Sequence, residues 1–151
     1  MAVHVPTPAD LLGLVGTELG PTDAVVVGQD RIDLFADATG DHQWIHVDPE
    51  RAAAGPFGAP IAHGYLTLSL VNMFLPELLV VDEFAMGVNV GLEKVRFPAP
   101  VKVGTAISAR GEIVSAAPQG DGIQVVVRVT VEADGVDRPV CVADTVSRFF
   151  P

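Results

Sequence analysis

The sequence predicts an α+β fold in which one long buried helix packs against an antiparallel sheet. The stretch 61–75 is apolar on almost every side of a helix, which is typical of a buried helix. Four strand-like stretches follow it, at 84–97, 102–117, 122–133 and 138–150, with turns between them that are rich in proline and glycine. Short connections favour antiparallel pairing, and a length of 151 residues suits a single domain that spans the whole chain.

The chain before residue 40 is predicted to form short elements. Thr7 is placed to cap a short helix that has Pro8 in its first turn. The β-branched run 25–27 is expected to form a strand that joins the main sheet. Asp30 is expected to cap the next helix, and Gly40 is expected to end it in a left-handed conformation.

Two further signals lead to the central helix. Asp48 followed by Pro49 predicts another helix cap, opening a turn of helix that stops at Gly55. The segment 56–60 contains prolines and a glycine and is expected to be a loop. The central helix is then predicted to begin at residue 61 and to end at Pro76, because proline cannot supply the backbone N–H that continues a helix.

Composition limits the range of functions. The formal net charge is −10, so an acidic surface would repel phosphate backbones and nucleic acid is not an expected partner. The 49% of hydrophobic residues exceeds what a small monomer needs, which favours an oligomer. The lone Cys141 cannot form an internal disulfide and is expected in the core. No signal peptide or membrane span is recognisable, so a cytoplasmic location is expected.

The candidate catalytic residues are an acid and an imidazole five residues apart, Asp41 and His46, directly after the helix-ending glycine. A curved loop can bring two such side chains to one point, where they can act as a general acid–base unit near neutral pH. The same pattern is also compatible with a solvated loop acid. The chain has no zinc-ligand spacing and no nucleophile elbow around Ser69, so neither a metal site nor serine hydrolysis is predicted.

Three stretches carry a family resemblance. Residues 40–48 read Gly-Asp-His-Gln-Trp-Ile-His-Val-Asp, residues 60–64 read Pro-Ile-Ala-His-Gly, and residues 92–101 read Leu-Glu-Lys-Val-Arg-Phe-Pro-Ala-Pro-Val. In this order they resemble the signature of the MaoC-like family of (R)-specific enoyl-CoA hydratases, in an actinobacterial branch that also resembles nodulation protein N. The resemblance is clear over about residues 30–105 and continues beyond them only as a pattern.

The resemblance implies a hot-dog fold, a long central helix wrapped by an antiparallel sheet, and a homodimer whose sheets join edge to edge. It implies hydration of trans-2-enoyl-CoA to (R)-3-hydroxyacyl-CoA, or the reverse dehydration, with no cofactor other than the coenzyme A of the substrate. Asp41 and His46 would hold and activate the water, and the backbone N–H of Gly64 would stabilise charge on the thioester oxygen. The acyl group could be carried by coenzyme A or by an acyl carrier protein.

Other residues are candidates for substrate contacts. Many hydratases carry Asn-Pro where this chain has Gln43-Trp44, so this pair bears on the substrate rather than on the chemistry. A local cluster of cations, which could hold coenzyme A phosphates, sits within a short stretch of an otherwise acidic chain. The cluster consists of Lys94, Arg96, Lys102 and Arg110. The remaining candidates are Asn89 and His63, and for His63 a role in orienting the start of the central helix is favoured; His4 and His42 are expected at the surface.

Two alternatives to the hydratase stay open. Hot-dog folds also host acyl-CoA thioesterases, which usually place their acid in or beside the central helix, where the 61–75 stretch has none. A non-catalytic acyl-CoA-binding module is the other alternative, because a fold does not by itself guarantee an activity.

Overall fold

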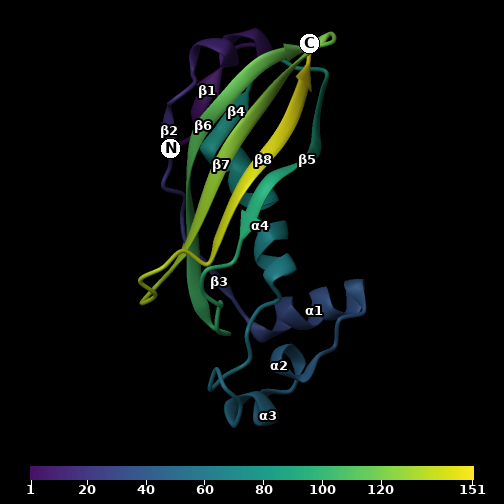
Figure 1. Ribbon diagram of the computed structural model, residues 1–151, viewed down its shortest axis with the longest axis vertical. Coiled ribbons are helices and arrows are strands. Elements are labelled where there is room, and N and C mark those ends of the chain that lie inside the picture. The colour runs from purple at the N-terminus through teal and green to yellow at the C-terminus, as the bar shows by residue number, and fades with distance from the viewer.

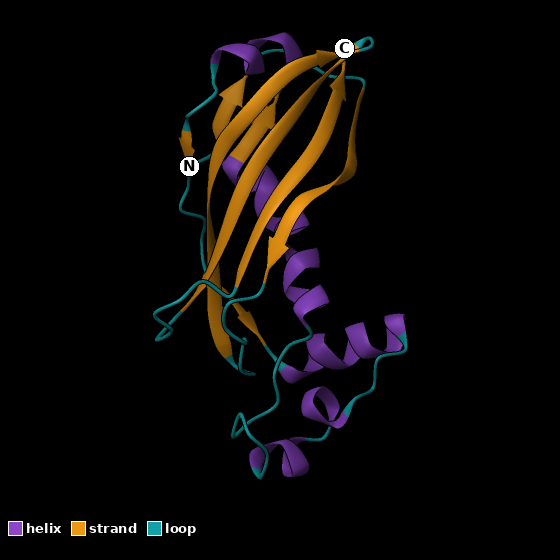
Figure 2. Ribbon diagram, viewed as in Figure 1, coloured by secondary structure: helices purple, strands orange, loops and turns teal.

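The computed structural model describes all 151 residues, and it is dominated by a curved antiparallel sheet wrapped around one long helix (Figures 1 and 2). The helices are η1 (Pro8–Gly13, a 3-10 helix), α1 (Gln29–Thr39), α2 (Trp44–Val47), α3 (Pro49–Ala53) and α4 (Gly64–Leu78). The strands are β1 (Val3–Val5), β2 (Glu18–Leu19), β3 (Val25–Val27), β4 (Leu79–Val81), β5 (Met86–Arg96), β6 (Thr105–Gln119), β7 (Gly122–Ala133) and β8 (Cys141–Phe150). The predicted α+β class and all four long strands are confirmed.

The main sheet has the strand order β2-β6-β7-β8-β5, with β3 also paired to β6. All of its pairs are antiparallel, and short turns join β6 to β7 and β7 to β8 as predicted. The turn at 98–100 does not pair β5 with β6, because β5 instead pairs with β8 at the opposite side of the sheet. Strands β1 and β4 form a separate parallel pair that joins the start of the chain to the end of α4. In Figure 1, α1, α2 and α3 lie beyond one end of the sheet, close to the start of α4.

The core forms between the concave face of the sheet and one face of α4. Strand β7 alternates as a half-buried strand should, and the side chains of Val125, Val127, Val129 and Val131 are all buried. Phe74 of α4 is completely buried among them and the rest of a core cluster of 25 residues. Because these contacts anchor α4 along the sheet, they also fix where its first turn lies.

The central helix differs from the prediction in three ways. It begins at Gly64, because Ile61 instead forms an isolated bridge with Lys102. It runs past Pro76 to Leu78, since a proline loses only its own N–H bond and later residues still donate. One side of α4 is also exposed, because a stripe of exposed residues runs along the helix. The stripe consists of Tyr65, Ser69, Asn72 and Pro76.

The shorter elements bring two corrections and several confirmations. Asp30 does not cap α1, because Gly28 occupies the N-cap and Asp30 lies in the first turn. Residues 44–47 form the short helix α2, which the sequence patterns did not indicate. Gly40 does end α1 with a positive φ of 82°, and the Asp48 carboxylate accepts a hydrogen bond from the Arg51 N–H at the start of α3. None of the helices combines the length and hydropathy needed to cross a membrane.

Candidate active site

Asp41 is brought to the site by the end of α1. The left-handed Gly40 donates its N–H to the Ala36 carbonyl at 2.8 Å, which closes the helix and turns the chain away from its axis. The Asp41 carboxylate then accepts a hydrogen bond from the Gln43 N–H at 3.2 Å, as in an Asx turn. Gln43 in turn occupies the N-cap of α2, and the His46 N–H donates to its carbonyl at 3.0 Å. The residues between the acid and the imidazole therefore form one compact turn.

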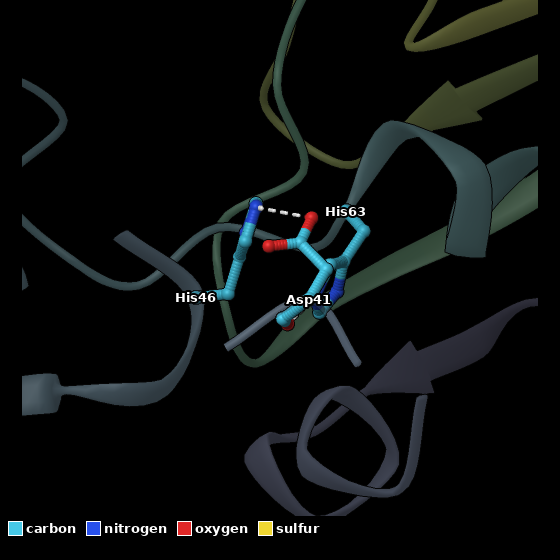
Figure 3. Close-up of side chains that lie close together, drawn as sticks. All are labelled: Asp41, His46 and His63. Carbon is cyan, nitrogen blue, oxygen red and sulfur yellow. Dashed lines mark hydrogen bonds and ion pairs between the residues drawn. The ribbon is translucent and has the colours of Figure 1, made fainter. Parts of the chain in front are cut away.

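His46 lies on α2 and is buried, and a backbone contact sets its tautomer. Its Nδ1 lies 2.7 Å from the Ile61 carbonyl oxygen. Because a carbonyl can only accept, Nδ1 carries the proton of the neutral ring and Nε2 keeps a free lone pair. That Nε2 lies 4.0 Å from Oδ2 of Asp41, whose side chain is about half exposed (Figure 3). The gap exceeds a direct hydrogen bond and leaves room for an atom held by both groups.

His63 and Gly64 complete the arrangement at the start of α4. His63 is buried at the N-cap, but its side chain does not cap the helix. Its Nε2 instead donates to the Asp41 carbonyl oxygen at 2.9 Å, and its ring stacks on that of His46 with centroids 3.9 Å apart. Gly64 is the first residue of α4, so its N–H has no acceptor within the helix and lies at the positive end of the helix dipole.

These groups open into one cavity of about 440 Å³. Its lining residues are Phe35, Thr39, Asp41, His46, His63, Gly64, Tyr65 and Phe97. The sequence reasoning missed Phe35, Thr39, Tyr65 and Phe97. The first two are four residues apart on α1 and therefore share a face of that helix, a signal that could have placed them beside Asp41. Phe97 follows the end of β5, and nothing in its local sequence indicates that its ring packs against Gly64.

Other predicted residues lie outside this cavity. The Trp44 ring packs against Gly55, and the Arg51 guanidinium lies 4.4 Å from its centre, so within this chain Trp44 packs between α2 and α3. Gln43 is exposed and serves α2 through its backbone carbonyl. The Asn89 side chain accepts from the Gly91 N–H at an irregularity of β5.

The cationic cluster divides between different surroundings. Lys94 and Arg96 lie on β5 and line, with Arg128, an open pocket of about 350 Å³ around Asp144. Arg110 lies on β6 and is paired with Glu132 at 2.6 Å. Lys94, Arg96 and Lys102 form no ion pair within the chain, but only the two β5 cations line this pocket.

The two remaining histidines are at the surface, as predicted. His4 pairs with Asp82 at 2.8 Å. His42 is next to Asp41 in sequence, but its Nε2 pairs with Asp37 at 2.9 Å. The hydrogen bond that His42 donates to the Asp37 carboxylate raises the pKa of His42 above its ordinary value. His42 does not line the cavity.

Asp41, His46 and His63 also form a cluster of potential metal ligands. One potential ligand atom from each lies within 4.8 Å of the others. However, the two imidazole rings are stacked at an interplanar angle of 22° with their centres 3.9 Å apart. Lone pairs of imidazole nitrogens lie in the ring plane, so those of stacked rings do not converge on a point about 2.0–2.1 Å from both, as a tetrahedral zinc ion requires. The donor set does not fit such a metal site.

Comparison with known proteins identifies the class to which this fold and site belong. A family model described as "MaoC like domain" matches residues 11–135. The chain is 49% identical to 3-hydroxyacyl-thioester dehydratase Z of Mycobacterium tuberculosis strain H37Rv over 93% of this chain and 94% of that protein. It is 45% identical to nodulation protein N of Rhizobium leguminosarum bv. viciae over 99% and 96% of the two chains.

The solved structure of R-hydratase PhaJ1 from Pseudomonas aeruginosa has a TM-score of 0.72 at 23% identity, over 90% of this chain and 81% of that chain, and so has the same fold. The chain belongs to the MaoC-like dehydratase family and has the hot-dog fold. It is an enzyme of the hydratase/dehydratase type. The resemblance recognised from three short stretches of sequence is therefore confirmed.

Proposed function

We propose that this enzyme adds water reversibly to trans-2-enoyl-CoA and forms (R)-3-hydroxyacyl-CoA. The observation that carries the proposal is the convergence of the Asp41 carboxylate, the free Nε2 of His46 and the first N–H of α4 on one cavity. The name of the Mycobacterium tuberculosis relative, a 3-hydroxyacyl-thioester dehydratase, supports an acyl thioester as substrate. No cofactor beyond the coenzyme A of the substrate is required.

In the proposed mechanism, Asp41 and His46 hold one water between them. Two acceptors 4.0 Å apart can each lie about 2.8 Å from a single water oxygen, with an angle of about 90° between the two hydrogen bonds. His46 Nε2 accepts one proton as the water oxygen bonds to C3 of the enoyl group, and Asp41 accepts a hydrogen bond from the other hydrogen. The C2–C3 double-bond electrons move to an enolate on the thioester oxygen. The protonated Nε2 then returns its proton to C2, so the enzyme ends unchanged.

Charge builds on the thioester oxygen during this step. The Gly64 N–H is a donor without a helical acceptor at the positive end of α4, and it lines the same cavity as the acid–base pair. A preorganised donor of this kind stabilises the enolate without reorganising during the reaction. We assign the oxyanion role to Gly64 on this basis.

Lys94 and Arg96 are proposed to hold phosphate groups of coenzyme A. Their charges are unpaired within the chain, and Arg96 directly precedes Phe97, which lines the reaction cavity. Lys94→Gln and Arg96→Gln are expected to raise KM for crotonyl-CoA with little change in kcat. Arg110→Gln is the matched control, because Arg110 is already paired with Glu132. An unchanged KM in both β5 variants would reject this role.

The enzyme is proposed to work as a homodimer in which β5 pairs with β5 of a second copy. Strand β5 is hydrogen-bonded to β8 on one side only, and its apolar residues Met86, Val90 and Leu92 are each more than 40% exposed. A long apolar edge strand is a template for pairing with another strand. Light scattering is expected to give twice the chain mass of 15.8 kDa, and a monomer at micromolar concentration would contradict the proposal.

The central test of function is hydration of crotonyl-CoA, followed by loss of the absorbance of the conjugated thioester. Wild type, Asp41→Asn, His46→Gln and the double variant are compared. Each single variant is expected to lose about 10²–10⁴-fold in kcat with a near-normal KM. The double variant should be little worse than the worse single variant, because the pair acts as a unit. If either single variant keeps near-full kcat, that residue is not catalytic.

The same assay separates the alternatives. A thioesterase would release free coenzyme A thiol, and a binding module would change neither signal. The only acid of α4 is Glu77, in its last turn and outside the reaction cavity, so the structure offers no helix acid beside the site for a thioesterase mechanism.

A further inference from the structure

His63 forms three contacts that its position at the start of α4 does not require. A buried residue at this N-cap would satisfy the helix by accepting from its first N–H groups, yet the His63 side chain makes no such bond. Its Nε2–H donates to the Asp41 carbonyl, its ring stacks on His46, and the Phe35 ring packs beside it at 4.9 Å. All four side chains line the reaction cavity.

The other ring nitrogen of His63 is left without a partner. Nδ1 is buried and accepts no hydrogen bond in the protein. With Nε2–H committed to a carbonyl, Nδ1 of the neutral ring is an unsatisfied acceptor, which weakens the folded state compared with a phenyl ring of similar shape. A residue selected only for packing would have no reason to carry this defect. The function of His63 is therefore expected to reside in its single donor, Nε2–H.

We propose that His63 is a positioning residue, which holds the loop bearing Asp41 so that the carboxylate faces His46 across one water. The tether spans 22 positions of sequence and joins the Asp41 backbone to the first turn of α4, the element that also carries Gly64. Asp41 itself is about half exposed, and the other hydrogen bond that restrains it, from the Gln43 N–H at 3.2 Å, lies within the same turn and does not tie that turn to α4. The His63 contact therefore holds the acid in a fixed position relative to the base and to the N-terminus of α4. The inference rests on the proposed function of the pair.

Two variants separate the donor from the ring. His63→Phe keeps an aromatic ring between Phe35 and His46 and removes both nitrogens. His63→Gln removes the ring and keeps an N–H donor of similar reach. If the tether positions Asp41, His63→Phe should lose about 10²-fold in kcat for crotonyl-CoA with KM within about twofold of wild type, the size of effect expected when a reacting group is misplaced by about 1 Å. His63→Gln should recover a substantial part of that loss.

Stability and structure provide readouts besides activity. His63→Phe removes both the unsatisfied Nδ1 acceptor and the hydrogen bond to the Asp41 carbonyl, and these changes affect stability in opposite directions, so its melting temperature should stay within a few degrees of wild type. A crystal structure should show Asp41 Oδ2 further than 4.0 Å from His46 Nε2. Wild-type kcat in His63→Phe, or an unmoved Asp41, overturns the proposal. A raised KM at unchanged kcat assigns His63 to substrate binding instead, and lower melting temperatures in both variants assign it to structure; either result also overturns it. If Asp41→Asn and His46→Gln keep their activity, the failure lies with the proposed function and not with the tether.

Discussion

The oxyanion role of Gly64 can be tested by deleting a single hydrogen-bond donor from the backbone. Gly64→Pro removes the N–H, and the structure allows proline there. Proline is favoured at the first position of a helix, where the N–H has no helical acceptor. The residue before a proline must be extended, and His63 already is, with φ −57° and ψ 138°. The helix should therefore form as in wild type.

Gly64→Ala is the matched control, because it adds a Cβ and keeps the N–H. A Cβ at this position would lie 3.3 Å from two atoms of the Phe97 ring and 3.4 Å from a third. The Phe97 ring must move by a few tenths of an ångström, which lowers the stability of the fold. The higher helix propensity of alanine, worth about 1 kcal/mol, raises it. Since both variants crowd the Phe97 ring, the ratio of their kcat values measures the contribution of the Gly64 N–H alone. Loss of one oxyanion donor is expected to lower kcat about 10²–10³-fold, or about 2.7–4 kcal/mol.

The assay is crotonyl-CoA hydration at saturating substrate. If the added side-chain atoms only weaken substrate binding, they raise KM and leave kcat unchanged. Circular dichroism melts of both variants check that α4 is intact. Equal kcat in Gly64→Pro and Gly64→Ala would refute the reasoning, because the N–H would then contribute nothing to the transition state. A low kcat in Gly64→Ala alone would point to the Phe97 contact instead.

Three further outcomes follow from the structure. Burial raises the pKa of the Cys141 thiol to about 11, so a disulfide reagent at pH 8 should label the unfolded protein quickly and the native protein hardly at all; rapid native labelling would contradict this. The pKa of His42 is raised by its hydrogen bond with Asp37, so the stabilisation from this pair is present below pH 6.5 and is lost as the pH rises through the folded pKa. Asp37→Asn should therefore lower the pKa of His42 measured by NMR titration. An unchanged pKa would reject the pairing. Phe74→Ala should cost about 3–5 kcal/mol in urea unfolding, because the ring is completely buried, and a cost below about 1 kcal/mol would count against this core.

Signals confined to a few neighbouring residues predicted the structure well. Gly40 and Asp48 were placed correctly because an αL cap and an Asx cap are decided by the residue itself and the N–H groups within one turn. Asp30 was wrong because an acidic residue in the first turn favours the same helix end as a capping residue, so the two positions look alike in sequence.

Features that depend on distant partners were the ones missed. The β1–β4 pair joins residues 76 positions apart, and no local pattern announces it. The start of α4 was misplaced because Ile61 is apolar in either setting, and its bridge to Lys102 is visible only in the fold. The exposed stripe on α4 was also missed, since residues such as Tyr65 are apolar enough to look buried.

The candidate site combined both kinds of signal. Asp41 and His46 could be predicted as catalytic only because they fall in a family signature, since an Asp and a His five residues apart are common by chance. Their geometry could not be predicted, since it depends on the Ile61 carbonyl that sets the His46 tautomer and on the Asp41 carbonyl that holds His63. These acceptors are backbone atoms, and no side-chain pattern encodes them.

The core and the acid–base pair lie on different elements of the fold, which explains why the catalytic variants are expected to fold. Most of the buried apolar side chains belong to α4 and to the long strands, whereas α1 buries only Ile32 and Ala36, and α3 only Ala52. The acid–base pair therefore sits on elements that contribute little to the core, beyond one end of the sheet in Figure 1. Only Gly64 belongs to an element that the sheet holds firmly, so the oxyanion donor is the fixed point of the site and Asp41 must be brought to it. A change in the α1–α2 turn should then alter kcat without altering the melt, whereas a change under α4 should alter both, and the contrast between Asp41→Asn and Phe74→Ala measures this difference directly.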